Sequence, residues 1–170
     1  DYATYFAEGV EAWTYLKFPY LRRLGREAGW NRVGPLARLN ICDHIPTPLA
    51  EAERILFKAQ TNGQPNNSSM HYHWARIIEM LHCAELMKQL LQDPNILGDD
   101  LQREGERQPV GIGVVEAPRG TLIHHYEADE KGMVTHANLI VSTTHNNEAM
   151  NQAVHQVAQS HISQKPEITE

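Results

Sequence analysis

The spacing of apolar residues predicts a first long helix over about 46–62. From Thr47 to Gly63 apolar residues recur every three or four positions, as on one face of a helix. Pro48 suits the first helical position, the Thr47 hydroxyl can accept from the first-turn amides, and Gly63 suits the end. The residues expected to face inward are Leu49, Ala52, Ile55, Leu56 and Ala59.

A second helix is predicted over about 69–92, beginning at a serine cap. At 1.5 Å per residue its roughly 24 residues measure about 36 Å. A helix this long exceeds the core that a chain of 170 residues builds around it, so we expect part of its apolar surface to be exposed. The residues expected to face inward are Met70, Trp74, Ile77, Ile78, Leu81, Ala84, Leu86 and Leu90.

A third helix is predicted over about 146–163, with Asn146 or Asn147 as its cap. The residues expected to face inward are Met150, Val154, Val157 and Ile162.

Between the second and third helices the pattern changes to the two-residue alternation of strands. VGIGVVEA, TLIHHYEA and VTHANLIVS are separated by PRG and DEKG, which predicts an antiparallel meander over about 110–142. The aromatic-rich first thirty residues suggest a short helix near 2–8 and a strand or turn near 14–18. The chain is therefore predicted to be α+β, with residues 1–170 as a single domain.

Charge and composition exclude several classes of protein. Lys plus Arg number 15 against 21 for Asp plus Glu, a net charge of −6, which disfavours nucleic acid or an anionic membrane as the main partner. The apolar runs are too short to span a bilayer, and the start at Asp1 shows no signal-peptide pattern; it resembles a piece excised from a longer protein. Cys42 and Cys83 lack metal-ligand spacing and are expected to be free, mostly buried thiols.

Candidate chemistry from the residues alone narrows to one arginine. His71 and His73 point about 200° apart on a helix, so they cannot share one metal ion and are expected to face solvent or cap the helix. His124 and His125 face opposite sides of a strand, so at most one looks at any given site.

No nucleophile motif, P-loop or dinucleotide fingerprint is present. Glu116 and Glu127 flank the arginine turn; they could balance its charge or lie on a polar face of the sheet, and they are only a weak signal for an acid/base pair. Arg119 remains, held between Pro118 and Gly120 at the tip of a hairpin. It is either an aimed functional group or a merely exposed turn residue.

Three stretches give the chain a resemblance to a known family. RVGPLARLN at 32–40, EAPRGTLIHHY at 116–126 and IVSTTHNN at 140–147 resemble, in order and spacing, the large subunits of nickel–iron (NiFe) hydrogenases. WTYLKFPYLRRLG and MHYHWARIIEMLHCAE look most like the NAD-linked, bidirectional, cytoplasmic group. The resemblance covers essentially the whole chain.

The resemblance implies roles for four residues. Arg119, with Pro118 beside it, matches the family arginine that hangs above the open side of the nickel–iron centre and donates to a cyanide on iron. Thr143 matches the residue that donates to the other cyanide, and His124 matches a histidine that follows the arginine block. Two positions depart from the better-known pattern, Ser142 replacing a proline and His145 a tryptophan, so the surroundings of the second cyanide differ.

The resemblance also implies what lies outside this chain. The family binds its Ni–Fe(CN)2(CO) centre through two CxxC motifs, and neither is present here. We therefore expect an internal fragment that supplies outer-shell residues, contains no metal as isolated and is inactive alone.

The parent is expected to oxidise H2 reversibly in the cytoplasm and to reduce NAD through diaphorase subunits that receive electrons from an iron–sulfur small subunit. The alternative is a non-catalytic scaffold or partner-binding module. The fragment alone is expected to self-associate through its exposed apolar surface. The electron acceptor (NAD, NADP or a deazaflavin) depends on other subunits.

Overall fold

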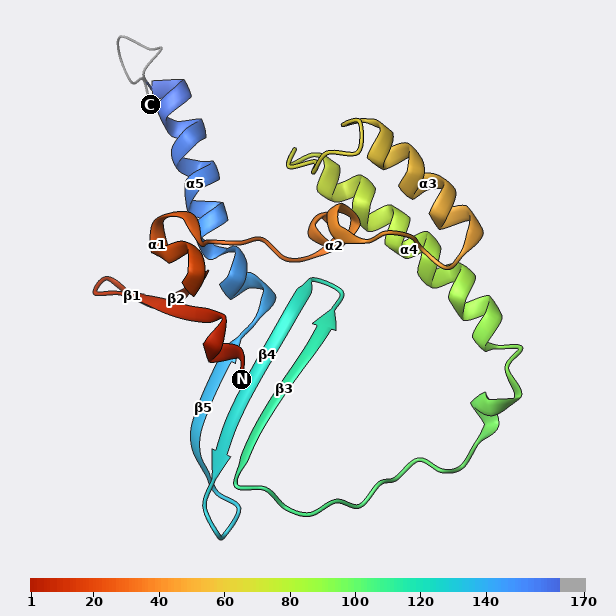
Figure 1. The fold of residues 1–170 in the computed structure, drawn as a ribbon, viewed down its shortest axis with the longest axis vertical. Helices are drawn as coiled ribbons and strands as arrows, with labels where there is room; N and C mark the ends of the chain where they lie inside the picture. The colour runs from red at the N-terminus through yellow and green to blue at the C-terminus, as the bar shows by residue number, and fades with distance from the viewer. Residues whose placement is uncertain (163–170) are drawn as a thin grey trace, which may run out of the picture. The chain divides into compact units, whose positions relative to one another are not determined.

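The computed structural model describes residues 1–162, which form helices and two antiparallel sheets and confirm the α+β class. The chain divides into two compact units (Figure 1). The strand unit comprises Asp1–Val33 together with the described residues from Pro109 onward, and the helical unit comprises Gly34–Gln108. That the whole chain acts as one domain stays a prediction.

The predicted meander forms the main sheet of the strand unit. β3 (Val110–Ala117), β4 (Gly120–Ala128) and β5 (Val134–Ile140) pair antiparallel in the order β3-β4-β5. Ala117 pairs with Gly120, so Pro118 and Arg119 alone form the loop between the first two strands. Gly120 has φ 132°, a backbone conformation that favours glycine, so the bend depends on this residue.

The N-terminal segment is a β-hairpin, and the helix predicted near 2–8 is wrong. A short 3-10 turn (η1, Tyr2–Thr4) precedes β1 (Phe6–Glu11) and β2 (Thr14–Leu21), which pair antiparallel. β2 contains Pro19, which it tolerates because each strand of a two-stranded sheet is an edge strand, where a missing amide is allowed. A 3-10 turn (η2, Arg22–Leu24) and α1 (Gly25–Ala28) follow.

The third predicted helix, α5 (Ser142–Ile162), begins four residues earlier than expected; residue 163, its predicted end, lies outside the described residues. Neither asparagine caps it. Asn146 Oδ1 accepts from the Val33 amide at 2.9 Å, and Asn147 Nδ2 donates to the Lys17 carbonyl at 3.1 Å. The residues predicted to face inward are instead exposed: Met150, Val154, Val157 and Ile162. Hydrogen bonds of Asn146 and Asn147, and not a stripe of these apolar residues, therefore hold the start of α5 against its neighbours.

The helical unit packs three helices around one apolar core. α2 (Pro35–Ile41), α3 (Pro48–Ala59) and α4 (His71–Leu90) are followed by a 3-10 turn, η3 (Pro94–Leu97). The buried core residues are Leu36, Leu39, Ile45, Ala50, Phe57, Ala75 and Ile78.

The inward face predicted for α3 is wrong. Ala50 and Phe57 are buried, whereas the predicted residues Leu49, Ile55 and Leu56 are more than half exposed. The segment carries two apolar stripes, and packing against α4 buries the one that contains Ala50 and Phe57. The sequence pattern alone does not distinguish between them.

The start of α3 is capped by a carboxylate from α4. Thr47 is the N-cap residue, but its hydroxyl lies 2.9 Å from His82 Nδ1 and does not cap the helix. Glu85 accepts instead from the amides of Leu49 and Ala50, at 3.1 and 3.0 Å. Its carboxylate thus satisfies first-turn amides that the helix leaves free.

The end of α3 follows the prediction more closely. The helix stops at Ala59, and Gly63, with φ 78°, donates back to the Lys58 carbonyl at 2.9 Å. This left-handed glycine closes the turn that follows the helix.

The predicted long helix is confirmed as α4, but it has no serine side-chain cap, and its inward face is partly wrong. Ala75 and Ile78 are buried, and Trp74 and Leu81 pack against the core. Met70 and Ile77 are 74% and 62% exposed, so the predicted exposure of apolar surface is confirmed.

The stability of the helical unit should depend on Glu51 at low pH. Arg54 donates to its carboxylate at 2.7 Å, as does the Ile45 amide, and these bonds lower the pKa of Glu51 to about 2. The folded pKa lies below the unfolded value of about 4.3, so this stabilisation is complete above that value and is lost as pH falls toward 2.

The free energy of unfolding, measured with urea, should therefore rise with pH between pH 2 and 5, and Glu51→Gln should reduce the slope of this rise. Glu104→Gln, in the exposed connecting loop, is the matched control and should leave the slope unchanged. Equal slopes for wild type and Glu51→Gln would contradict the expectation.

Candidate functional site

Arg119 occupies the second position of the two-residue loop between β3 and β4, as the sequence predicts. Its side chain is exposed. Pro118 fixes one backbone angle of the loop, and the Ala117–Gly120 pair closes the ladder directly beneath it. The sheet therefore presents a guanidinium on a short and rigid support.

The strand register places Thr143 at the same end of the β3-β4-β5 sheet as Arg119. We call this end, where the strands turn, the edge of the sheet. Ile123 on β4 pairs with Ile140 on β5, so the chain that continues past Ile140 runs toward the level of the hairpin loop. α5 follows directly after β5 (Figure 1), and Thr143 lies in its first turn with an exposed side chain. Two hydrogen-bond donors that are far apart in sequence thus reach one edge of the strand unit.

His124 and His125 lie on opposite faces of β4, as predicted. His124 shares its face with Tyr126, their ring centres 5.9 Å apart. His125 lies on the face covered by the N-terminal segment, where its Nδ1 is 3.4 Å from the Tyr2 hydroxyl. His124 therefore lies on β4 beyond the loop that carries Arg119, on the face of the sheet opposite to the Tyr2–His125 contact.

Glu116 and Glu127 do not form an acid/base pair. Glu116 pairs with Thr121 next to the loop and accepts from its hydroxyl at 2.7 Å. Glu127 pairs with Val110 at the other end of the two strands.

A buried amide that the sequence did not single out connects the two sheets of the strand unit. Asn138, 9% exposed, donates to Glu8 at 2.6 Å and to the Tyr2 hydroxyl at 2.9 Å. Its Oδ1 accepts from Lys17 Nζ at 2.7 Å. No sequence signal marks this residue, because its partners come from β1, β2 and η1, more than 100 positions away.

From Tyr2 the polar contacts continue to the surface. The Tyr2 hydroxyl lies 3.4 Å from His125 Nδ1, and His125 Nε2 lies 3.8 Å from the exposed carboxylate of Glu127. The His136 ring packs edge-on against His125, with 5.5 Å between the ring centres. The covered face of the sheet thus carries a line of polar and titratable groups.

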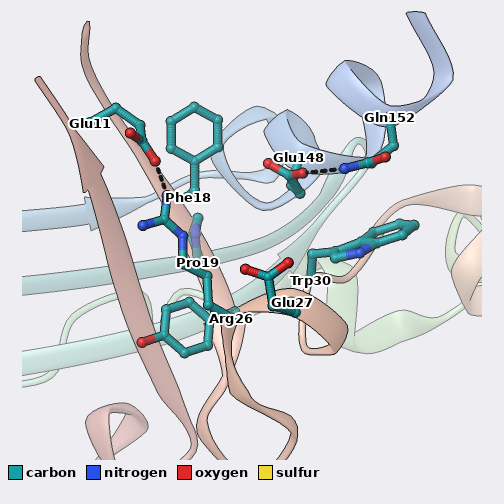
Figure 2. A pocket seen from close by; sticks show the side chains of 9 residues that line it. Glu11, Phe18, Pro19, Arg26, Glu27, Trp30, Glu148 and Gln152 are labelled. Carbon is teal, nitrogen blue, oxygen red and sulfur yellow. Dashed lines mark hydrogen bonds and ion pairs between the residues drawn. The ribbon is translucent and has the colours of Figure 1, made fainter. Parts of the chain in front are cut away.

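A separate pocket of about 370 Å³ lies between the N-terminal hairpin, α1 and α5. Figure 2 shows the carboxylates of Glu11, Glu27 and Glu148 around it, with Arg26 bonded to Glu11. Gln152 donates to Glu148 at 2.8 Å. None of the residues predicted to contribute to the site lines this pocket.

The histidines and cysteines of the helical unit do not gather into a ligand set. His71 packs its ring against Phe57 and Trp74, contrary to the solvent-facing or capping role predicted for it, whereas His73 is exposed as expected. Cys42 is half-buried, and burial raises its pKa; Cys83 is exposed, which corrects the expectation of a buried thiol.

Over residues 1–162 no group of three or more His, Cys, Asp or Glu side chains is placed to hold a metal ion. Within the same residues no helix is both long and apolar enough to cross a membrane.

Comparison with known proteins identifies the family. The model of the nickel-dependent hydrogenase family matches residues 3–161. The chain belongs to this family. Its resemblance to the hydrogenase large subunits is thereby confirmed over nearly its whole length.

Relatives and a solved structure support this membership. The chain is 51% identical to the NAD-reducing hydrogenase HoxS subunit beta of Cupriavidus necator, over 100% of this chain and 36% of that protein. It is 48% identical to a subunit of the F420-non-reducing hydrogenase vhu of Methanococcus voltae, over 94% of this chain and 38% of that protein. A crystal structure of an NAD+-reducing NiFe hydrogenase in the H2-reduced state matches with a TM-score of 0.90 and 51% identity, over 100% and 38% of the two chains.

The chain therefore spans little more than a third of the length of these relatives. Its candidate site fits the periphery of a metal centre. An exposed guanidinium and a hydroxyl at one edge are donors suited to an anionic ligand, whereas binding nickel and iron directly requires ligands such as paired thiolates.

Proposed function

We propose that this chain is the central part of the catalytic subunit of a NiFe hydrogenase that oxidises H2 reversibly and couples the reaction to NAD reduction. The observation that supports this proposal is the placement of Arg119 and Thr143 at one edge of the β3-β4-β5 sheet. The 51% identity to a subunit of an NAD-reducing enzyme favours NAD as the acceptor.

In this proposal Arg119 donates to one anionic ligand of the centre, and Thr143 donates through its hydroxyl to a second. A guanidinium is a planar fork of donors, and a rigid two-residue loop reduces the cost of holding it in place. Pro118 stiffens the loop, and His124 contributes to the surroundings of the arginine. When bound, the Ni–Fe(CN)2(CO) centre supplies the chemistry that splits H2, and these residues act around it.

The proposed partners are an iron–sulfur small subunit, which receives the electrons, and diaphorase subunits that reduce NAD. The proposed location is the cytoplasm, and nucleic acid and membrane are not proposed as partners. The relative in Cupriavidus necator is described as one subunit of an NAD-reducing hydrogenase, in keeping with such an assembly.

A second candidate function is a non-catalytic scaffold or partner-binding module. The exposed apolar residues of α3 favour it, because Leu49, Ile55 and Leu56 form a surface that another protein surface would cover. The two candidates differ in whether a metal centre forms at all.

The test compares the 170-residue chain alone with the full-length protein that contains it. We expect the chain alone to hold no stoichiometric nickel or iron and to reduce no dye with H2. The full-length protein, assembled with its partners, should contain both metals and reduce NAD+ with H2. A full-length assembly that lacks nickel would favour the scaffold, and a metal-loaded chain alone would contradict the proposed outer-shell role.

The chain alone should self-associate, because α4 also exposes apolar side chains, among them Ile77, Met80 and Met87. Sedimentation should show the mean mass rising with concentration, together with binding of a hydrophobic dye. The double variant Ile77→Gln/Met80→Gln should weaken both signals. A strict monomer at high concentration without dye binding would refute this expectation.

A further inference from the structure

The start of α5 carries three consecutive polar residues, His145, Asn146 and Asn147, which follow Thr143 by two to four positions. Asparagine is a poor helix former, because its side chain competes for hydrogen bonds of the backbone. Neither asparagine caps the helix, and their side chains bond to backbone groups 113 and 130 positions away. These side chains therefore serve the tertiary structure and not the helix itself.

Asn146 bonds to both backbone groups of one residue, Val33. Its Oδ1 accepts from the Val33 amide at 2.9 Å, and its Nδ2 donates to the Val33 carbonyl at 3.3 Å. A half-turn of the side-chain amide would place oxygen against oxygen and nitrogen against nitrogen, so the two bonds together fix its orientation. Val33 is only 9% exposed, and its backbone groups depend on such partners. The contact thus fixes both the distance and the direction between Val33 and α5.

The residues on either side of Asn146 attach α5 to the N-terminal hairpin. His145 is 1% exposed, and its ring packs edge-on against Phe6 of β1, with 5.5 Å between ring centres. Its backbone amide donates to the Val141 carbonyl at 3.0 Å, at the junction of β5 and α5. Asn147 Nδ2 donates to the carbonyl of Lys17 on β2 at 3.1 Å. Three adjacent side chains therefore hold the start of α5 in place.

Thr143 lies on the same part of α5 but on its exposed side. Ser142 and His145 are buried, whereas Thr143 is exposed. On a helix, residues three and four apart are neighbours, so Thr143 lies beside Asn146 and Asn147. Each helical amide also bonds to the carbonyl four residues earlier, so a displacement of the attached residues displaces Thr143 with them.

We propose that Asn146 is a positioning residue: through its two bonds to Val33 it directs the Thr143 hydroxyl at an anionic ligand of the metal centre. This proposal rests on the proposed function, which makes Thr143 the donor to that ligand. Asn146 itself touches neither the centre nor its ligands. Because a hydrogen bond weakens steeply outside a narrow range of distance and angle, a shift of about 1 Å at Thr143 is enough to break it.

A positioning role differs from a general contribution to the fold in one measurable way. If Asn146 acts through Thr143, its loss has no further effect on the site once the Thr143 hydroxyl is absent. If Asn146 only stabilises the strand unit, its loss and the loss of the hydroxyl act independently, and their effects on the rate multiply.

The test uses the full-length enzyme with its partners and measures the infrared bands of the two cyanides, which shift when a hydrogen bond to a cyanide is lost. Thr143→Val removes the donor and should shift one of the two bands. Asn146→Ala should shift the same band in the same direction. The rate of H2 oxidation should fall about tenfold in Thr143→Val and about threefold or more in Asn146→Ala, with unchanged nickel and iron content.

The double variant Thr143→Val/Asn146→Ala should match Thr143→Val alone in both band position and rate. Asn151→Ala, at an exposed asparagine of α5, is the matched control and should match wild type. Should Asn146→Ala fail to accumulate, Asn146→Ser replaces it, because serine is too short to bond both backbone groups of Val33.

The outcomes separate this inference from the proposed function. Unshifted cyanide bands in metal-loaded Asn146→Ala, or rate losses that multiply in the double variant, would overturn the positioning role alone. Wild-type bands in metal-loaded Thr143→Val would refute the donor role of Thr143, and the inference with it. A wild-type enzyme that shows neither cyanide bands nor H2 oxidation would overturn the proposed function as a whole.

Discussion

Arg119→Lys in the full-length protein should lower H2 oxidation by roughly two to three orders of magnitude, a loss of about 3 to 4 kcal/mol in transition-state stabilisation. Lysine keeps the positive charge but loses the planar set of donors and its fixed direction. The fold and metal content should be preserved, because the side chain is exposed and the bend depends on Pro118 and Gly120. The measurement is H2-dependent dye reduction, with nickel and iron determined on the same sample.

The matched control is Arg103→Lys. Arg103 is also exposed and forms its ion pair with Asp100 in the connecting loop, in the helical unit. This variant should run at the wild-type rate. If Arg119→Lys is fully loaded with metal and equally fast, Arg119 is only an exposed residue of a turn, and the proposed role for the hairpin loop is wrong.

Phe57→Ala should lower the free energy of unfolding of the chain by about 3 to 5 kcal/mol, because it leaves a cavity in the core of the helical unit. Phe57 is fully buried and packs edge-on against Trp74, with 5.3 Å between ring centres. Urea unfolding followed by helical circular dichroism gives the measurement, in dilute solution so that association does not contribute.

Its neighbour Leu56 provides the control. Leu56 is 54% exposed, so Leu56→Ala should cost about 1 kcal/mol or less. The pair also tests which face of α3 is buried, because the spacing of apolar residues favoured Leu56. If Leu56→Ala is the more destabilising of the two, the packing of α3 on α4 is wrong.

The sequence determined the type of most elements but not which faces they bury. Periodicity located α3, α4 and the meander, because these repeats follow from the geometry of helix and strand. The inward faces of α3 and α5 were wrong since burial depends on a neighbouring element, and a helix with two apolar stripes fits either way. In the N-terminal hairpin the strand or turn predicted near 14–18 lies within β2, whereas β1 was missed because only its pairing with β2 reveals it.

The candidate site, too, could be predicted only in part from the sequence. The motif residues Pro118, Arg119, His124 and Thr143 could be named from the sequence, because a two-residue loop and a family pattern are local features. Their proposed roles stay predictions. That Arg119 and Thr143 reach one edge follows from the pairing of β4 with β5, which fixes the direction in which α5 begins.

The sequence by itself determined the α+β class, the hairpin loop that carries Arg119 and the membership in the hydrogenase family, since each depends on residues close together in the chain or on the order of the family's motifs. Only the tertiary structure showed that Glu85 caps α3 and that Asn138 joins β5 to the N-terminal segment. It alone showed that His145 is buried. These features depend on side chains brought together across 35 to more than 100 positions, and the pattern of residues along the chain does not reveal such long-range contacts.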